Sequence, residues 1–127
     1  MSQYYDLGEE SLWNPSNGAA RLFHRQVALF EAELGVPSGI GPMENDECQI
    51  NPGALGPFAE ALITRHGLTG HAVIRALSEG FVATVLVLAE RAGVRVNWPV
   101  SPVNSYESTV ADELRALARE MSGAMPR

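Results

Sequence analysis

The sequence predicts a mainly α-helical domain, a compact bundle of about four helices with a small N-terminal hairpin and a short edge strand. Apolar residues recur every three or four positions in four segments, which is the spacing of one helical face. Glycine, proline and asparagine separate these segments, and 46% of the 127 residues are hydrophobic, which suffices for a buried core. The length fits a single domain over residues 1–127.

Residues 1–13 predict a β-hairpin, because two short aromatic or apolar stretches flank a Gly-Glu-Glu turn. The first helix is predicted over residues 17–34. Ser16 or Asn17 can cap its first amides, and Gly35 supplies the left-handed residue that ends it. Its apolar face consists of Phe23, Val27, Phe30 and Leu34.

The second helix is predicted over residues 52–66, with Asn51 as its N-cap and Pro52 in its first turn. Before it, residues 36–51 form the longest irregular segment of the chain. Loops of this length tend to be functional or disordered, so this loop is the candidate for a functional site. His66 falls in the last turn of the second helix, where the helix dipole favours a protonated imidazole, and we expect it to cap that helix.

The third helix is predicted over residues 70–92. Residues 80–89 are apolar on every side, as expected for a central helix that its neighbours cover completely. The β-branched residues in this stretch leave a buried strand over 81–88 open as an alternative. Three other helices of moderate length do not cover such a stretch on every side, so we expect a homodimer.

The last part of the sequence predicts a strand and a helix. Residues 94–98 alternate between apolar and polar side chains, like a short edge strand that Pro99 ends. The fourth helix is expected over residues 106–121. Four residues in the middle of the apolar stripes should be buried in the core: Phe30, Phe81, Leu88 and Leu114.

Charge and cysteine content exclude several classes of function. The chain has 15 acidic and 9 basic residues, a net charge of −6, which argues against binding to nucleic acid or to a membrane. All nine basic residues are arginine, which excludes lysine chemistry. A single cysteine and the lack of an N-terminal secretion signal predict a cytoplasmic protein.

The sequence contains none of the familiar cofactor, nucleophile or metal motifs. Glycine patterns for dinucleotides or phosphates, the G-x-S-x-G turn and the H-E-x-x-H pair are absent. The three histidines lack the three- or four-residue spacing that would place two of them on one helical face. We therefore expect no cofactor and no metal site.

The densest group of polar residues is Glu44-Asn45-Asp46-Glu47-Cys48, inside the long loop. Carboxylates that converge in a partly dry pocket repel each other, which raises the pKa of one of them toward the range for acid/base catalysis. Asp46 and Glu47 are the predicted catalytic residues, and Asp46 is preferred because it has the inward parity of Cys48 along a strand. A solvated acidic turn is the alternative.

Other residues are assigned to the same site. His24, on the first helix, is predicted as a third catalytic residue that stabilises charge, and a surface ion pair with Glu31 is the alternative. Arg21 is predicted to hold a carboxylate or enolate of the substrate. Trp13 and Trp98 each stand next to turn residues, where an indole can line a ligand pocket or close the end of a core. The predicted substrate-binding residues are Trp13, Asn14, Met43 and Arg21.

Four short pieces of the sequence carry a resemblance to known proteins. They are Tyr4-Tyr5-Asp6-Leu7-Gly8, Leu12-Trp13-Asn14-Pro15, Pro37-Ser38-Gly39-Ile40-Gly41-Pro42-Met43 and Asp46-Glu47-Cys48. Together they resemble a group of short actinobacterial proteins of unassigned function, over most of the chain up to about Val100. The resemblance implies a soluble single domain in which the 37–48 loop is typical of the group, and it implies no activity.

Two classes of function remain. The first is a small-molecule-binding protein of bacterial specialised metabolism, in its most specific form a cofactor-independent acid/base enzyme of cyclase, isomerase or dehydratase type. The alternative is a protein-interaction module, of immunity or accessory-subunit type, that masks a basic partner surface. A closed pocket reached by Asp46 or Glu47 would favour the first class, and an acidic face without a pocket would favour the second.

Overall fold

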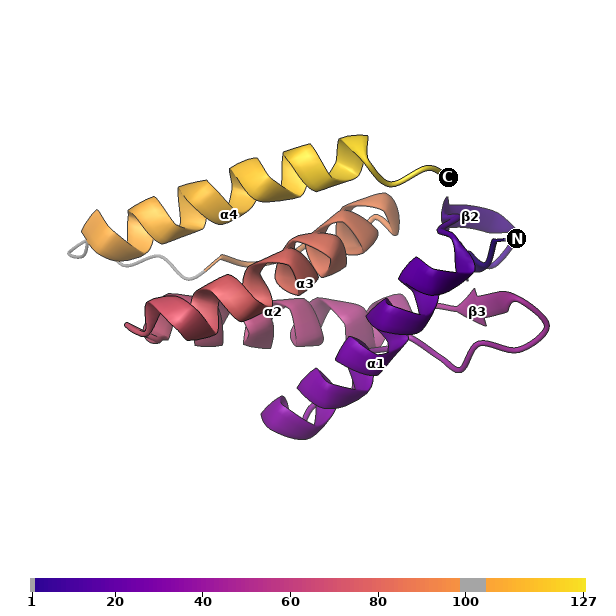
Figure 1. Ribbon diagram of the computed structural model, residues 1–127, viewed down its shortest axis with the longest axis horizontal. Helices are drawn as coiled ribbons and strands as arrows, with labels where there is room; N and C mark the ends of the chain where they lie inside the picture. The colour runs from indigo at the N-terminus through magenta and orange to yellow at the C-terminus, as the bar shows by residue number, and fades with distance from the viewer. Residues whose placement is uncertain (1, 99–104) are drawn as a thin grey trace.

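The structure is a computed structural model that describes residues 2–98 and 105–127. Its elements follow the order β1, β2, α1, β3, α2, α3 and α4 (Figure 1). In the same order, their bounds are Tyr4–Leu7, Glu10–Trp13, Asn17–Leu34, Glu47–Gln49, Pro52–Leu68, Ala72–Arg91 and Ser105–Gly123. The fold is therefore mainly α-helical with an N-terminal hairpin, as predicted.

Helix α3 lies between α2 and α4 and packs against both, while α1 crosses this layer at an angle (Figure 1). The small sheet lies at one end of the bundle, beside both chain termini (Figure 1). The opposite end of the molecule consists of the end of α2 and the starts of α3 and α4 (Figure 1).

Residues 81–89 of α3 are all buried, and they are helical, so the alternative of a strand over 81–88 is wrong. By length and composition α3 is the one helix in the described part of the chain that is apolar enough to cross a membrane, with a mean hydropathy of 1.8. Thr84 Oγ1 donates to Gly80 O at 2.8 Å, which satisfies the hydroxyl within the helix. Because the chain itself covers residues 81–89, this stretch gives no argument for a homodimer.

Aromatic side chains hold α1 against the helical layer. The ring of Phe81 on α3 stacks on Phe30 with a centroid distance of 4.6 Å, and it lies 5.4 Å from Phe23. Phe81, Leu88 and Leu114 are buried, as predicted. Phe30 is only half-buried, contrary to the prediction, because it stands at the edge of the contact between α1 and α3.

The sheet has the strand order β2-β1-β3, with β1 antiparallel to β2 and parallel to β3. Tyr5, on the central strand, pairs with Trp13 on one side and with Cys48 on the other. All three side chains are buried, so the inner face of the sheet belongs to the core. The third strand comes from inside the loop over residues 36–51, and it fixes the end of that loop.

The predicted helix caps are present. Ser16 Oγ accepts a hydrogen bond from Ala19 N at 3.3 Å, and Gly35 is left-handed with φ 66°. Asn51 Oδ1 accepts from Gly53 N at 2.9 Å at the start of α2. Helices α2 and α4 each extend two residues past their predicted ends.

Residues 94–98 form no strand, contrary to the prediction. Their backbone is bound to the helices instead: Val94 N donates to Ala89 O, and Asn97 N donates to Glu60 Oε1, both at 2.9 Å. Alternating side chains give a strand only where a neighbouring strand offers its backbone groups. The proline expected to end this strand lies outside the described residues.

Candidate functional site

The acidic turn of the long loop is exposed. Glu44, Asp46 and Glu47 all face solvent, and the Asp46 carboxylate accepts from Gln3 Nε2 at 3.4 Å. Asn45 and Asp46 are left-handed, with φ 53° and 64°, so the chain turns here and the strand begins at Glu47. The prediction that Asp46 shares the inward direction of Cys48 is therefore wrong, because strand parity does not extend through a turn.

His24 lies in a hydrogen-bonded cluster between α1 and the sheet. Its Nδ1 is 2.6 Å from the Tyr5 hydroxyl, and its Nε2 is 3.0 Å from Gly41 O. The Cys48 thiol donates to the same carbonyl at 3.1 Å. A neutral imidazole that donates from Nε2 and accepts at Nδ1 satisfies both contacts. Each nitrogen of His24 is thus engaged with the protein.

The long loop is held by α1 at two points, one of which is His24. Two turns further along the helix, Glu31 Oε2 accepts from the backbone N of Ser38 at 2.9 Å and from its hydroxyl at 3.0 Å. Gly39, the next residue, has φ 79° and passes so close to α2 that a Cβ would lie 2.4 Å from Asn51 O. These contacts make the loop a fixed part of the fold.

Neither ionisable group beside His24 is charged near neutral pH. Burial, with a smaller effect from Cys48, raises the pKa of Tyr5 above its usual value. Burial also raises the pKa of the Cys48 thiol to about 11. A thiol in this state is a poor nucleophile, so the cluster supports the fold and offers no reactive group.

The predicted substrate-binding residues lie apart from each other. Trp13 is buried and stacks on Tyr5 at 5.1 Å, whereas Arg21 is exposed on α1. Asn14 N donates to Pro126 O at 2.7 Å, and Met43 packs against the core. The structure brings Trp13 and His24 together around Tyr5, but not Asp46 or Arg21. None of the seven predicted residues lines the cavities between the helices that are described next.

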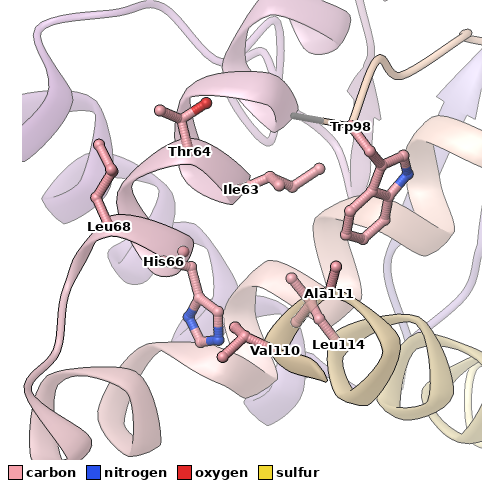
Figure 2. Close-up of a pocket in the computed structure, with 9 residues that line it drawn as sticks. Ile63, Thr64, His66, Leu68, Trp98, Val110, Ala111 and Leu114 are labelled. Atoms are coloured by element: carbon pink, nitrogen blue, oxygen red, sulfur yellow. The ribbon is translucent and has the colours of Figure 1, made fainter. Parts of the chain in front are cut away.

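A cavity of about 170 Å³ lies between the end of α2, the segment that follows α3, and the start of α4 (Figure 2). Its walls are mostly apolar, and Thr64 and His66 are the polar side chains among its described lining residues. Figure 2 shows the imidazole of His66 beside Val110, and Trp98 on the side of α4. The described lining residues are Ile63, Thr64, His66, Gly67, Leu68, Trp98, Val110, Ala111 and Leu114.

His66 is buried, with 7% of its surface exposed, whereas His24 is half-buried. In contrast to His24, its Nδ1 is buried and has no hydrogen-bond partner among the described residues. Burial lowers the pKa of His66 from 6.5, and Arg75 lowers it further, against the opposing effects of Glu79 and Glu113. The expectation of a protonated, helix-capping imidazole is therefore wrong, because the side chain is desolvated inside the bundle.

Trp98 forms one wall of this cavity, which is one of the two roles expected for an indole next to a turn. The guanidinium carbon of Arg115, on α4, lies 4.1 Å from the centre of the indole ring, a distance typical of a cation–π contact. Sequence reasoning missed the rest of the cavity, because its residues come from three segments that are up to about fifty positions apart. The signal available was the histidine within the apolar pattern of the second helix.

His66 also borders two open grooves. The groove between α3 and α4 has a volume of about 410 Å³ and contains Arg75 and the carboxylates of both helices. The groove between α1 and α3 has a volume of about 220 Å³ and is lined by apolar side chains that include Leu29 and Leu77. Within residues 2–98 and 109–127, no three His, Cys, Asp or Glu side chains come together as they would to hold a metal ion.

Comparison with known proteins adds a family but no activity. No curated protein and no solved structure matches the chain. A family model does match, over residues 1–127, and its description is a family of unknown function. The chain therefore belongs to the DUF6086 family.

Proposed function

We propose that this protein binds a small, uncharged and largely apolar molecule in the cavity between α2 and α4. The observation that carries the proposal is the cavity, with a volume of about 170 Å³ and no charged side chain among its described lining residues. An engineered apolar cavity of about 150 Å³ is known to bind benzene. By that comparison, this cavity accommodates one aromatic ring with a small substituent.

The packing around the cavity supports a ligand. Protein interiors are close-packed, and a void larger than a water molecule forfeits the dispersion contacts of every atom in its walls. Ile63 and Leu114 are buried side chains whose surfaces meet this space. A ligand that fills it would restore those contacts and stabilise the folded state by mass action.

The proposal is for binding without catalysis. The acid/base reaction predicted from the sequence uses the carboxylates of the acidic turn, and no carboxylate is among the described lining residues of the cavity. Asp46 and Glu47 are exposed in the turn before and at the start of β3, in a different part of the chain. The enzymatic form of the hypothesis thus has less support than the binding form.

Thermal unfolding with toluene, a neutral molecule of the right size, tests the proposal. At ten times its Kd, toluene is expected to add about 1.4 kcal/mol of stability, which raises Tm by roughly 5 °C. Ala111→Leu should abolish the shift, because it adds three carbons to the wall of the cavity. Ala32→Leu, at an exposed position of α1, is the matched control and should keep the shift. A wild-type protein with no shift at saturating toluene would contradict the proposal.

A second candidate is the protein-interaction module that masks a basic partner surface. The observation in its favour is that Glu44, Asp46 and Glu47 are exposed and lie outside the cavities described above. Its test is complex formation with the basic product of a neighbouring gene. Replacement of the three carboxylates by amides should weaken such a complex and reduce its salt dependence.

The homodimer stays a prediction, and light scattering at micromolar concentration tests it. The stretch that suggested it is covered within one chain. A monomer at that concentration would contradict the prediction without bearing on the ligand cavity.

A further inference from the structure

His66 is the polar group at one end of the ligand cavity, and its environment is unusual for a buried side chain. More than nine-tenths of the residue is buried, its Nδ1 has no hydrogen-bond partner among the described residues, and its imidazole forms part of the cavity wall (Figure 2). Most buried polar atoms in proteins are hydrogen-bonded, and each exception needs an explanation. A ligand that is bound in the working protein is such an explanation.

The protonation state of His66 determines what the missing partner must be. A neutral imidazole has one N–H group and one bare nitrogen. Buried N–H groups without a partner are rarer than buried acceptors without one, so the unpartnered Nδ1 is best described as the bare acceptor. A neutral acceptor requires a donor, which is a hydroxyl or an N–H group.

The side chains that line the cavity indicate the shape and charge of the ligand. Trp98 and His66 are flat rings that border the same space, and aromatic rings pack against each other in stacked or edge-on pairs. No charged side chain is among the described lining residues, so nothing there neutralises a carboxylate or an ammonium group. Both observations favour a neutral aromatic ring.

We propose that the ligand of this cavity is a neutral aromatic ring with one hydroxyl or N–H group, which donates a hydrogen bond to His66 Nδ1. This inference rests on the proposed function, since it concerns the same cavity. The imidazole can turn by 180° about its Cβ–Cγ bond, which exchanges the positions of Nδ1 and Cδ2. The acceptor therefore has two orientations in which to meet a donor, without any movement of α2.

Phenol and toluene form a matched pair for the test, because they differ only in hydroxyl against methyl. Their Kd values are measured for the wild type and for His66→Phe, which removes the acceptor. The ratio of phenol to toluene affinity should fall by about 2- to 12-fold in the variant, the size of one neutral hydrogen bond. The difference in hydration between phenol and toluene is the same for both proteins, so it cancels when the two ratios are compared. Any space that the larger phenylalanine ring takes from the cavity affects both ligands alike and also cancels.

The outcomes separate this inference from the proposed function. If wild type binds both molecules and the ratio is the same in His66→Phe, the hydrogen bond to His66 is contradicted while the binding cavity stands. If wild type binds neither, the proposed function fails first. In case His66→Phe does not fold, the imidazole ¹⁵N shifts of the wild type provide a second measurement. Phenol should move the His66 Nδ1 resonance and toluene should not, and an unmoved resonance at saturating phenol overturns the inference.

Discussion

One histidine lies at each end of this molecule, half-buried at the sheet end and buried at the helical end, and the ring nitrogens of the two have different surroundings. At the sheet end, both nitrogens of His24 have partners, Tyr5 and Gly41, within 3.0 Å. At the helical end, Nδ1 of His66 has none among the described residues, and the ring borders a cavity. Three side-chain oxygens at the sheet end also lack a described partner: Ser11 Oγ, Asn14 Oδ1 and Asn17 Oδ1. None of these residues lines a cavity described above, whereas His66 does.

This difference shows which feature points to a ligand. The sheet end is richer in residues of catalytic type, since Asp46, Glu47 and Cys48 lie near each other in the sequence. Their side chains are either exposed or held by the fold. An unsatisfied buried group beside a cavity is a better guide to binding than the density of reactive residue types.

The largest expected effect comes from Phe81, in the middle of α3. Phe81 packs against Phe23 and Phe30 of α1 and meets Phe58 of α2 edge-on at 6.3 Å. Phe81→Ala should lower the free energy of unfolding by about 3–5 kcal/mol, because it removes the centre of this cluster and leaves a void. Urea denaturation measures the loss, and a change below about 1 kcal/mol would mean that the cluster does not carry the fold.

The same substitution at the two histidines should have different effects on stability. His24→Phe leaves Tyr5 OH with a single weaker contact, Ala20 O at 3.4 Å, so a loss of about 1–3 kcal/mol is expected. His66→Phe removes an unpartnered nitrogen from an apolar site, so stability should stay within about 0.5 kcal/mol or increase. Urea denaturation of both variants tests the comparison, and equal losses would contradict it.

The fold was predictable where the signals are local. Three features of the sequence predict helix α1: Ser16 at its start, Gly35 at its end and the spacing of Phe23 and Val27. Each of them acts within a few residues of the chain. The strand predicted over 94–98 failed because a strand depends on a partner elsewhere in the chain. The backbone of this segment donates hydrogen bonds to Glu60 and to the end of α3 instead.

The site was less predictable, for two physical reasons. Asn45 and Asp46 are residue types that tolerate left-handed backbone, and this signal of a turn competes with the alternation that suggested an inward Asp46. The cavity depends on how α2, Trp98 and α4 come together, which no local pattern encodes. His66 was visible in the sequence, but its burial follows from tertiary packing and reverses the effect of the helix dipole on its charge.

The stability of the protein should depend on pH through a different residue at each end, His66 at the helical end and Cys48 at the sheet end. The folded state lowers the pKa of His66 from 6.5, so the unfolded chain binds more protons below that value and stability falls as the pH falls through 6.5. The folded state raises the pKa of Cys48 from 9.0 to about 11, so stability falls as the pH rises from 9 to 11. His66→Phe should flatten the acid side of the profile. Cys48→Ala should reduce the fall that begins at pH 9, while Tyr5, whose pKa burial also raises, still lowers stability above pH 10. Denaturant unfolding across the pH range measures both, and an acid side that is unchanged in His66→Phe would contradict the lowered pKa.

The smallest effect on stability and on ligand affinity is expected at Asp46, the residue that the sequence analysis preferred as catalytic. Asp46→Asn keeps the shape of the side chain and removes its charge. Because the carboxylate is exposed and its hydrogen bond with Gln3 is long, stability should change by less than about 0.5 kcal/mol. The Kd for toluene should stay the same within error, since Asp46 does not line the cavity. Asp46→Ala extends the test, because it also removes the polar side chain of Asp46, which follows Asn45 in the left-handed turn. A several-fold change in toluene affinity in either variant would mean that the two ends are coupled, and that the acidic turn belongs to the ligand site after all.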